Sequence, residues 1–315
     1  MEKRLKDVVE GSWDIEQSLL PRKHTIYHYT SPGGLLGILK DGGEPNLFFT
    51  QYDSLNDISE RDHAVELIHS VCKKCLKNKI FDQSFYELVI DCIQPQKILF
   101  AQPSAKHPGT IKPSWHEYDT YICSFSENED SLPMWNYYSK SHHYEGYNLG
   151  FYIEHELLDL LNGYKLKVAR VIYSDQDKEK LIKNMLVAIA KKMETEERET
   201  GKSWLMSWLS DSINDLVFAC KKSCFAHEEE VRMILRVPQD YRNTGIGRVS
   251  KRLHRDNNGF IIPYVEYTFA KGMVYEIHIA PLLNSKVAKQ NVDDLLKQRG
   301  YPSVPVIPSE IPIRF

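Results

Sequence analysis

The sequence has none of the long apolar runs or signal segments that direct a chain into or across a membrane. No stretch approaches the about 18 uninterrupted apolar residues that a membrane-spanning helix requires. Residues 1–17 are charged throughout, whereas a secretory signal has an apolar centre. We therefore expect a cytoplasmic protein with no membrane partner.

Short catalytic motifs are absent as well. The sequence contains no glycine-rich phosphate loop, no G-x-S-x-G nucleophile motif and no H-E-x-x-H metal motif. It has no internal repeat and no low-complexity tract. Function has to be inferred from less conspicuous combinations of residues.

Cysteine is scarce, at 6 residues in 315, which is too few for a disulfide scaffold. The spacings Cys72-x-x-Cys75 and Cys220-x-x-x-Cys224, the latter followed by His227, leave a zinc site open. The two pairs lie far apart in the chain, in helix-like segments where half-buried cysteines commonly pack. We favour packing thiols and expect no metal.

Neither sign of charge dominates. The net charge is −3, with 42% hydrophobic and 26% charged residues, which is typical of a globular protein. Such a balance provides no general basic field for non-specific binding to nucleic acid. Local basic patches remain possible at Lys221-Lys222 and between Arg242 and Arg255.

Short strands and helices alternate in irregular order. This pattern predicts an α+β fold with a mixed or antiparallel sheet rather than a doubly wound one. We expect a charged leader helix over residues 1–23 and a single α+β domain over 24–315, with helical insertions near 60–115 and 177–220.

The expected elements can be placed by periodicity and by turn residues. Residues 82–115 are predicted as a helix and an irregular proline-containing connection, and 242–258 as a basic loop. Trp204 and Trp208 are predicted to share one packing stripe on a helix. The predicted strands are 25–30, 47–50, 121–126, 146–154, 165–173, 231–235, 260–267 and 274–279, and the other predicted helices are 32–39, 60–77, 177–219 and 287–300.

A strand with hydroxyl side chains leads into an aromatic helix within residues 121–150. Ser124 and Ser126 lie on the strand face opposite Phe125. An acidic turn follows, and Ser131 can cap the helix that comes next. The strand end therefore presents hydroxyls directly beside the helix.

That helix is dense in aromatic residues, with Trp135, Tyr137 and Tyr138 close together. Any one of them alone is more typical of a core. Interleaved with serine and asparagine, the group as a whole indicates the floor and wall of a pocket for a flat ring.

A charged row precedes the strand at 231–235. In extended geometry Glu228, Glu230 and Arg232 project from one face, and Arg232 would hold down the carboxylate pKa values if the row is half buried. A solvated strand edge or a structural salt bridge explains the row equally well.

Polar residues nearer the N-terminus are ambiguous. His28 stands between two tyrosines in the first strand, where a histidine is usually a hydrogen-bonded structural residue. Asn56-Asp57 and Glu60 fit a polar turn as well as a site.

Taken in order, these pieces resemble a large bacterial family, domain of unknown function 2971. The likeness covers nearly the whole chain from about residue 24, and it rests on order and spacing, since each piece is short. The chain departs from the family pattern at Phe225, where Trp is more usual, at Pro281, near a place that tends to have Gly, and over 242–258, a local elaboration. The matching pieces are YHYTS at 27–31, LND at 55–57 with Glu60, SFS at 124–126, MWNYY at 134–138, the glycine-containing strand after 146, FAHEEEVR at 225–232 and SEIPIR at 309–314.

The family in turn looks like a distant relative of the ADP-ribosyltransferase fold, a split β-sheet that grips NAD. The resemblance implies that His28 holds the adenosine ribose and the nicotinamide amide, and that Ser124 and Ser126 form the Ser-x-Ser strand. It implies that Glu230 is the catalytic carboxylate and Glu228 the preceding member of a Glu-x-Glu pair. The residues expected to bind NAD are His28, Tyr29, Thr30, Asn56, Asp57, Ser124, Ser126, Trp135, Tyr137, Tyr138 and Arg232, with Tyr137 or Tyr138 stacking on nicotinamide.

Three functions follow as hypotheses. The first is an NAD-consuming ADP-ribosyltransferase with a macromolecular acceptor, or a glycohydrolase with water, in a toxin or phage-defence setting. The second is a non-catalytic module that binds a nucleotide or a protein. The third is a nuclease that places Asp57, Glu60, Glu228 and Glu230 around magnesium.

Overall fold

The computed structural model describes residues 19–41, 43–55, 59–93, 97–103, 111–139, 144–153, 164–257 and 259–313, with backbone alone at 59, 98–103 and 111–115. Most of the predicted leader helix over 1–23 lies outside the described residues, as do Asn56 and Asp57.

The sheet is built on β4 (Ile111–Ser126), which is longer than the predicted strand at 121–126. One edge of β4 pairs antiparallel with β7 (Glu230–Pro238) along the whole length of β7. Beyond β7 lies β6 (Lys165–Arg170), and β3 (Lys97–Pro103) forms a hairpin with the first half of β4.

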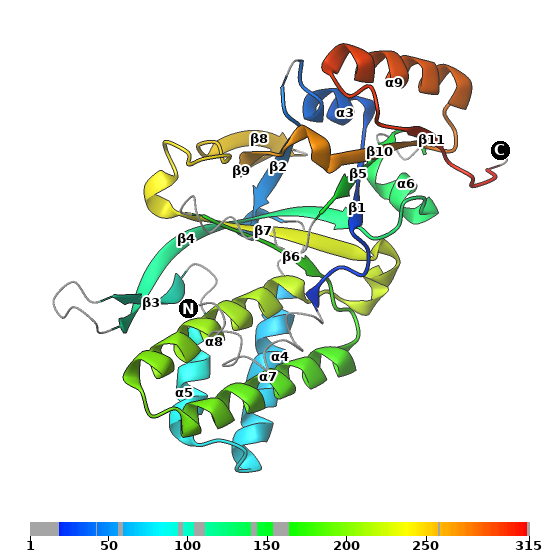
Figure 1. Ribbon diagram of the computed structural model, residues 1–315. Coiled ribbons are helices and arrows are strands. Elements are labelled where there is room, and N and C mark those ends of the chain that lie inside the picture. The colour runs from blue at the N-terminus through cyan, green and yellow to red at the C-terminus, as the bar shows by residue number, and fades with distance from the viewer. Residues whose placement is uncertain are drawn as a thin grey trace.

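The other edge of β4 is shared by two strands, and the sheet splits between them. β1 (Thr25–Thr30) meets β4 at Ser126, whereas β2 (Asn46–Gln51) meets it at Tyr121 and Ile122. Within the described ranges, no strand pairs on this edge with the residues in between. β4 therefore exposes a short unpaired edge where β1 and β2 diverge (Figure 1).

Each of these strands continues into a wing of the sheet. On one side β1 pairs with β5 (Tyr147–Tyr152), followed by β10 (Val274–Ile279) and β11 (Val306–Pro308). On the other side β2 pairs with β9 (Phe260–Thr268), which pairs with β8 (Leu253–Asn257). All these pairs are antiparallel except β10 with β11, so the predicted mixed sheet of an α+β fold is confirmed.

A helical layer covers one side of the central strands (Figure 1). It consists of α4 (Ser59–Lys77), α5 (Gln83–Cys92), α7 (Asp175–Thr195) and α8 (Glu199–Ala219). Three further helices lie with the wings, namely α3 (Pro32–Ile38), α6 (Leu132–Tyr138) and α9 (Ser285–Arg299).

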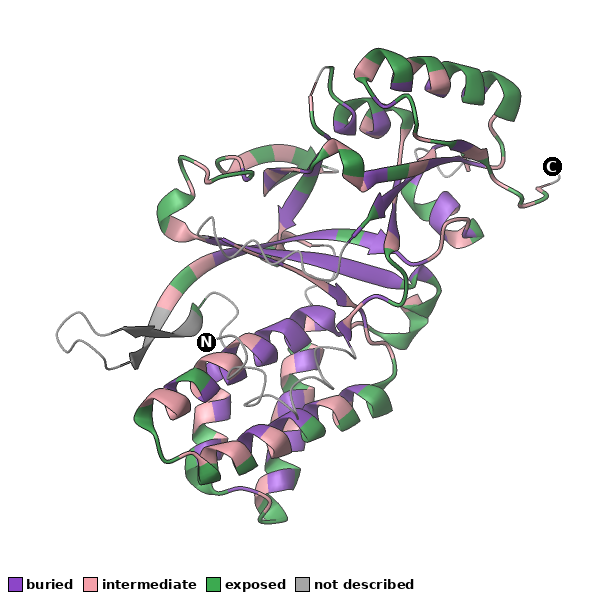
Figure 2. Cartoon of the chain, viewed as in Figure 1, coloured by how far each residue is buried: buried purple, intermediate pink, exposed green. Residues whose placement is uncertain are grey.

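β7 is buried on both faces, as the continuous purple of its ribbon shows (Figure 2). Val231, Met233 and Leu235 join the core shared with the wings, while Ile234 joins the core of the helical layer. This is the alternation expected of a strand between two layers. The same alternation turns Glu230 and Arg232 toward the helical side.

Two predicted connections contain strands. Residues 82–115 hold β3 and the start of β4 after α5, and 242–258 hold β8. The prolines in the first segment suggested an irregular chain, but proline is tolerated in edge strands and hairpins. The second segment has too few apolar residues to be recognised as a strand by alternation.

The predicted helix over 177–219 is two helices, because the chain turns at Glu196. The Glu196 carboxylate accepts a hydrogen bond from the backbone N–H of Arg198 at 3.0 Å, which stabilises this turn. The predicted tryptophan stripe is also wrong. Trp208 packs on the helical core, but Trp204 is 45% exposed.

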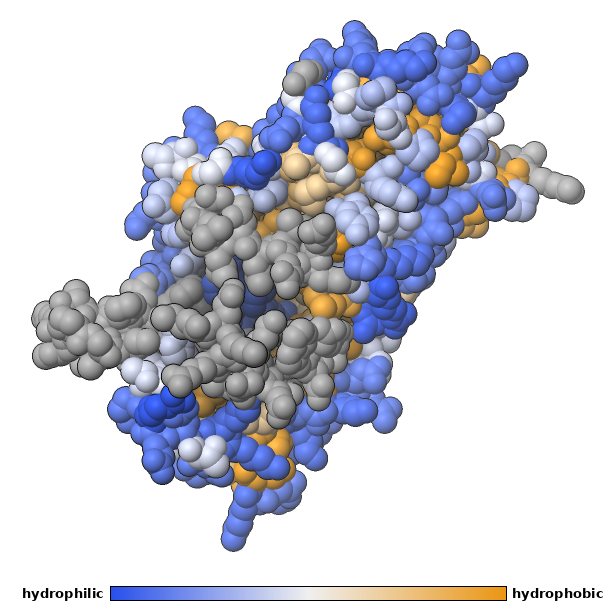
Figure 3. Space-filling view, viewed as in Figure 1, coloured by the Kyte–Doolittle hydropathy of each residue, from blue (hydrophilic) through white to orange (hydrophobic). Residues whose placement is uncertain are grey.

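The visible surface of the described chain is mainly hydrophilic, and its apolar patches are small and interrupted (Figure 3). Among the helices in the described ranges, none combines the length and apolar character required to cross a bilayer.

Candidate functional site

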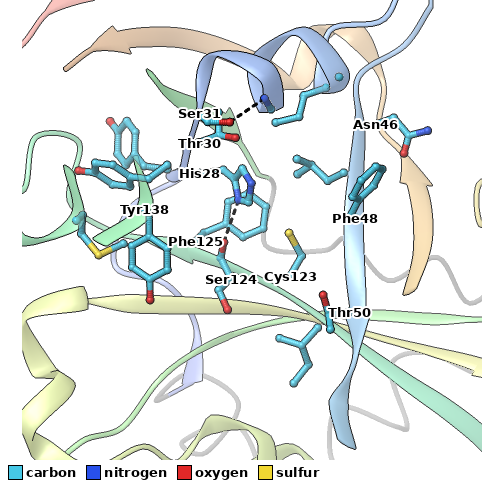
Figure 4. A pocket seen from close by; sticks show the side chains of 18 of the residues that line it. His28, Thr30, Ser31, Asn46, Phe48, Thr50, Cys123, Ser124, Phe125 and Tyr138 are labelled. Atoms are coloured by element: carbon cyan, nitrogen blue, oxygen red, sulfur yellow. Dashed lines mark hydrogen bonds between the residues drawn. The ribbon is translucent and has the colours of Figure 1, made fainter. Parts of the chain in front are cut away.

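A cavity of about 530 Å³ lies at the split of the sheet. His28 from β1, Ser124 from β4 and Glu230 from β7 all line it, and Figure 4 shows the first two next to each other, joined by a hydrogen bond. Ile122 and Cys123, which point to opposite faces of β4, line it as well. The cavity therefore crosses the open edge of β4 instead of lying on one face of the sheet.

His28 occupies the place that a neighbouring strand would take. Its Nδ1 lies 3.1 Å from the carbonyl oxygen of Ser124, on the unpaired edge of β4 (Figure 4). Because a carbonyl only accepts, Nδ1 carries the proton of this hydrogen bond. Loss of contact with water lowers the pKa of His28, and the positive charge of Arg255 lowers it further. The neutral imidazole therefore keeps Nε2 as an acceptor.

Glu230 is held by three neighbouring side chains. Its carboxylate accepts hydrogen bonds from Ser124 Oγ at 2.7 Å, from Arg232 Nε at 2.9 Å and Nη2 at 3.1 Å, and from Lys221 Nζ at 3.0 Å. Burial alone would raise the pKa of Glu230, but the charges of Arg232 and Lys221 outweigh it and lower the pKa to about 2. The carboxylate is therefore ionised, and its acceptor sites are occupied.

The same two cations hold two further carboxylates. Arg232 Nη2 lies 2.8 Å from Glu60 Oε2, and Lys221 Nζ pairs with Glu228. Burial raises the pKa of Glu60, although Arg232 opposes this. Glu228 also accepts a hydrogen bond from the Tyr138 hydroxyl at 3.1 Å. We call these five residues, Glu60, Lys221, Glu228, Glu230 and Arg232, the acid–base cluster.

The left-handed backbone conformation of Glu229 brings Glu228 and Glu230 together in the cluster. Residues 228–232 are not one extended row, because Glu228 ends a 3-10 turn and Glu229 has a φ of 43°. The prediction that Glu228 and Glu230 share a strand face is therefore wrong, yet the turn brings both carboxylates onto Lys221. Glu229 itself is exposed and contacts Asn128.

The acid–base cluster contains most of the carboxylates named in the nuclease hypothesis. Three of its four carboxylates, Glu60, Glu228 and Glu230, do converge, but they converge on Lys221 and Arg232. Asp57 lies outside the described residues. Across the described ranges, no group of three or more His, Cys, Asp or Glu side chains is placed to hold a metal ion.

Several residues predicted to bind a ligand are buried outside the cavity lining. Arg232 is only 3% exposed, donates a hydrogen bond to Glu230 and does not line the cavity. Ser126 is fully buried, donating to the Glu228 carbonyl at 2.7 Å and accepting from Asn128 N at 3.1 Å. Trp135 is fully buried and donates to Asp130 at 2.7 Å. None of these three side chains is among those that line the cavity.

Tyr29 and Thr30 both border the cavity. The Tyr29 hydroxyl is committed elsewhere, because it donates to the Asn128 carbonyl at 2.8 Å and accepts from Ser131 N at 2.9 Å. Thr30 approaches α3 so closely that a Cβ on Gly34 would lie 2.0 Å from its Oγ1. A side chain at position 34 would therefore force the Thr30 side chain to move.

The aromatic helix α6 contributes one tyrosine to the cavity. Tyr138 lines it, whereas Tyr137 is 57% exposed and packs near His227 outside the lining. Ser131 occupies the N-cap position of α6, but its side chain makes no capping hydrogen bond, contrary to expectation. Of the two tyrosines proposed to stack on a ring, only Tyr138 is placed to do so.

Five of the six cysteines are buried. Cys72 and Cys75 are buried in the core of the helical layer, where burial raises the pKa of the Cys72 thiol to about 12. Cys220 is buried too, and Cys224 is exposed.

Sequence reasoning missed two cations. Lys221 was noted only as part of a basic pair, and nothing local links it to Glu228 seven positions later. Arg255 lies in the segment predicted as a loop, yet it lines the cavity from β8. A signal for β8 was present in Asn258-Gly259, a pair that favours hairpin turns.

Comparison with known families gives one match. Residues 134–233 match the family model described as "Protein of unknown function (DUF2971)". The DUF2971 resemblance is confirmed over these residues, which include MWNYY and FAHEEEVR, while the pieces at 27–31, 55–57, 124–126 and 309–314 lie outside the match. No curated protein and no solved structure matches the chain.

The DUF2971 match covers α6, the helical pair α7 and α8, and the first part of β7. It includes Tyr138, Lys221 and Glu230, whereas His28 and Ser124 lie before it in the chain. The cavity therefore joins side chains of the DUF2971 segment to side chains from outside that segment.

Proposed function

We propose that this protein consumes NAD, or a related nucleotide, and transfers its ADP-ribose to a macromolecular acceptor. One observation carries the proposal: His28, Ser124 and Glu230, which come from three distant segments, line a single cavity at a split in the sheet. Its volume of about 530 Å³ lies in the range of small-molecule sites. Acceptor identity, the toxin or phage-defence setting and the cytoplasmic location stay predictions.

The chemistry begins with cleavage of the bond between nicotinamide and ribose. The electron pair of that bond leaves with nicotinamide, and positive charge develops on the ribose. An ionised carboxylate fixed beside the sugar stabilises this oxocarbenium character. The acceptor nucleophile then bonds to the ribose carbon and releases its proton; water in this role would give a glycohydrolase.

Glu230 fits the stabilising role better than the role of general base. A pKa of about 2 makes its carboxylate a weak proton acceptor at neutral pH. Among its donors, only the Ser124 hydroxyl is uncharged, and Ser124 lines the cavity. A ribose hydroxyl can take the place of Ser124 on Glu230 without separating any ion pair, because the other donors are cations.

The hydrogen bonds that occupy the Glu230 carboxylate also favour a second candidate, a non-catalytic nucleotide-binding module. In that case the acid–base cluster is a structural ion-pair network, and the cavity binds its ligand without cleavage. The enzyme would release nicotinamide from bound NAD, whereas the binding module would leave NAD intact.

The test is to incubate the purified full-length chain with NAD and measure nicotinamide by chromatography. We expect Glu230→Gln to slow release by about 10²-fold or more, as loss of a transition-state stabiliser does. Glu229→Gln is the matched control, since Glu229 is adjacent but exposed, and it should keep the wild-type rate.

A second variant guards against misfolding of Glu230→Gln. A Cβ on Gly37 in α3 would meet nothing within 4 Å, and Gly37 lines the cavity. Gly37→Phe should fold and block the cavity, while Gly37→Ala should leave it open. If NAD raises the melting temperature of wild type but not of Gly37→Phe, and wild type releases no nicotinamide, the protein is a binding module. If neither Glu230→Gln nor Gly37→Phe changes the rate of turnover, the proposed site is refuted.

A further inference from the structure

Arg255 gives the cavity a second charged wall. It lies on β8, within the 242–258 elaboration, and its guanidinium reaches the cavity from the β2 side of the split. Glu230 and Arg255 are the residues with opposite formal charges in the lining. The cavity is therefore bipolar, with an acidic wall on β7 and a basic wall on β8.

The guanidinium of Arg255 is held in place by neutral groups. Its Nη2 donates to Thr50 Oγ1 at 2.9 Å, and its Cζ lies 5.6 Å from the centre of the Phe48 ring and 5.7 Å from that of Tyr264. This contact with two rings and a hydroxyl fixes the orientation of the guanidinium without neutralising it.

Two other arginines of the same elaboration have carboxylate partners. Arg242 forms two 2.7 Å hydrogen bonds to Asp119, and Arg248 lies 3.2 Å from Glu44. For Arg255, no carboxylate partner exists among the described residues, and its buried Nε has no hydrogen-bond partner there either. A partly desolvated cation is stabilised by an anion nearby, and a ligand bound in the cavity can supply one.

We propose that Arg255 binds the phosphates of a nucleotide that carries a diphosphate, with the base against the exposed ring of Phe48. The planar fork of arginine matches phosphate oxygens in pairs. Phe48 lines the cavity and is 40% exposed, so part of its ring, which packs against Tyr264, stays accessible to a base. This assignment builds on the nucleotide pocket proposed above but does not require that the ligand be cleaved.

Binding of ADP tests the assignment, because ADP carries the diphosphate but has no nicotinamide bond to break. Isothermal titration of the full-length chain should show ADP binding at least about tenfold more tightly than adenosine. Arg255→Gln should weaken ADP about tenfold or more and leave adenosine unchanged. Arg255→Lys, which keeps the charge but loses the fork, should lie in between.

Arg252→Gln is the matched control. Arg252 belongs to the same elaboration and donates to Gln51, but it does not line the cavity, so this variant should bind ADP like wild type. Thermal unfolding verifies that each variant is folded.

Two results would overturn the assignment. One is equal ADP affinity of folded Arg255→Gln and wild type; the other is ADP binding no tighter than adenosine. Failure of the proposed catalysis looks different, since NAD would then stay intact while ADP binding still depended on Arg255.

Discussion

Two side chains that are adjacent in the sequence have unrelated roles in this protein. Lys221 is 11% exposed in its side chain and pairs with Glu228 and Glu230, whereas Lys222 points to the surface. Lys221 also lies 4.9 Å from the centre of the Phe225 ring. Its ammonium group is thus one of the two charges that keep Glu230 ionised.

Replacement of Lys221 by methionine should therefore be costly. Removing one partner from a buried ion pair typically costs about 3–5 kcal/mol, because it leaves an uncompensated charge. We expect Lys221→Met to lower the free energy of unfolding by that order, measured by urea denaturation at neutral pH.

Lys222→Met is the control for the same chemical change at an exposed position, and its effect should stay within about 0.5 kcal/mol. Equal effects of the two variants would mean that Lys221 does not support the acid–base cluster.

The C-terminal segment contacts the beginning of α6, the helix that carries Tyr138. Asp130, just before α6, accepts hydrogen bonds from Trp135 Nε1 at 2.7 Å, from Ser309 Oγ at 2.7 Å and from Glu310 N at 2.9 Å. Ile311 packs on the small core that contains Trp135. The SEIPIR motif at the end of the chain therefore anchors the helix that carries Tyr138 to the cavity.

Loss of one contact in this anchor should loosen α6. Ser309→Ala removes a donor to a carboxylate, worth about 1 kcal/mol or more, so amide hydrogen exchange in residues 132–138 should accelerate about fivefold or more. The measurement is hydrogen exchange followed by mass spectrometry.

Ser303→Ala is the matched control, because Ser303 is exposed in the same C-terminal segment. If both variants exchange α6 amides at the wild-type rate, the C-terminal segment does not hold this helix.

Buried charges join the two layers of the whole molecule. On β7, Arg232 binds Glu60 of α4, and Arg236 binds Asp211 and Asp215 of α8 at 2.8 and 2.6 Å. Both arginines face the helical layer together with Ile234. Docking of the helices thus depends on ionised carboxylates as well as on apolar burial.

This dependence predicts acid sensitivity. The pKa of Glu230 falls from its ordinary value of 4.5 to about 2, and Lys167, Lys165 and Arg236 outweigh the effect of burial to lower the pKa of Asp211. A group with a lowered pKa stabilises the fold above its ordinary pKa, and this contribution is lost as the pH falls through the folded value. For Glu230 the loss amounts to about 3 kcal/mol between pH 4.5 and 2.

Glu60 has the opposite sign. Burial raises its pKa, so the folded chain holds the Glu60 proton more tightly than the unfolded chain does. The contribution of Glu60 to the free energy of unfolding therefore falls as the pH rises above 4.5. Urea unfolding of wild type and Glu230→Gln between pH 2 and 7 separates these terms. The stability difference between the two proteins should shrink below pH 4.5, and a constant difference would show that Glu230 is not ionised through its neighbours.

Periodicity along the chain predicted much of the secondary structure. The strands at 25–30 and 274–279 and the helix at 60–77 lie where alternation and helical spacing placed them. Such patterns are local, because each side chain's orientation depends on its own strand or helix. The segment 97–103, which contains a continuous apolar run, and the polar segment 253–257 had no alternation to reveal their strands.

The sequence by itself thus determined the faces of the strands and the kinds of residue available for a site, including His28, Ser124 and Glu230. Only the tertiary structure decided which of them meet. Ser124 and Glu230 are brought together by pairing of β4 with β7 across about a hundred residues, and the left-handed turn at Glu229 adds Lys221. Local pattern carries no information about such partners, because pairing and burial depend on segments that are distant in the chain.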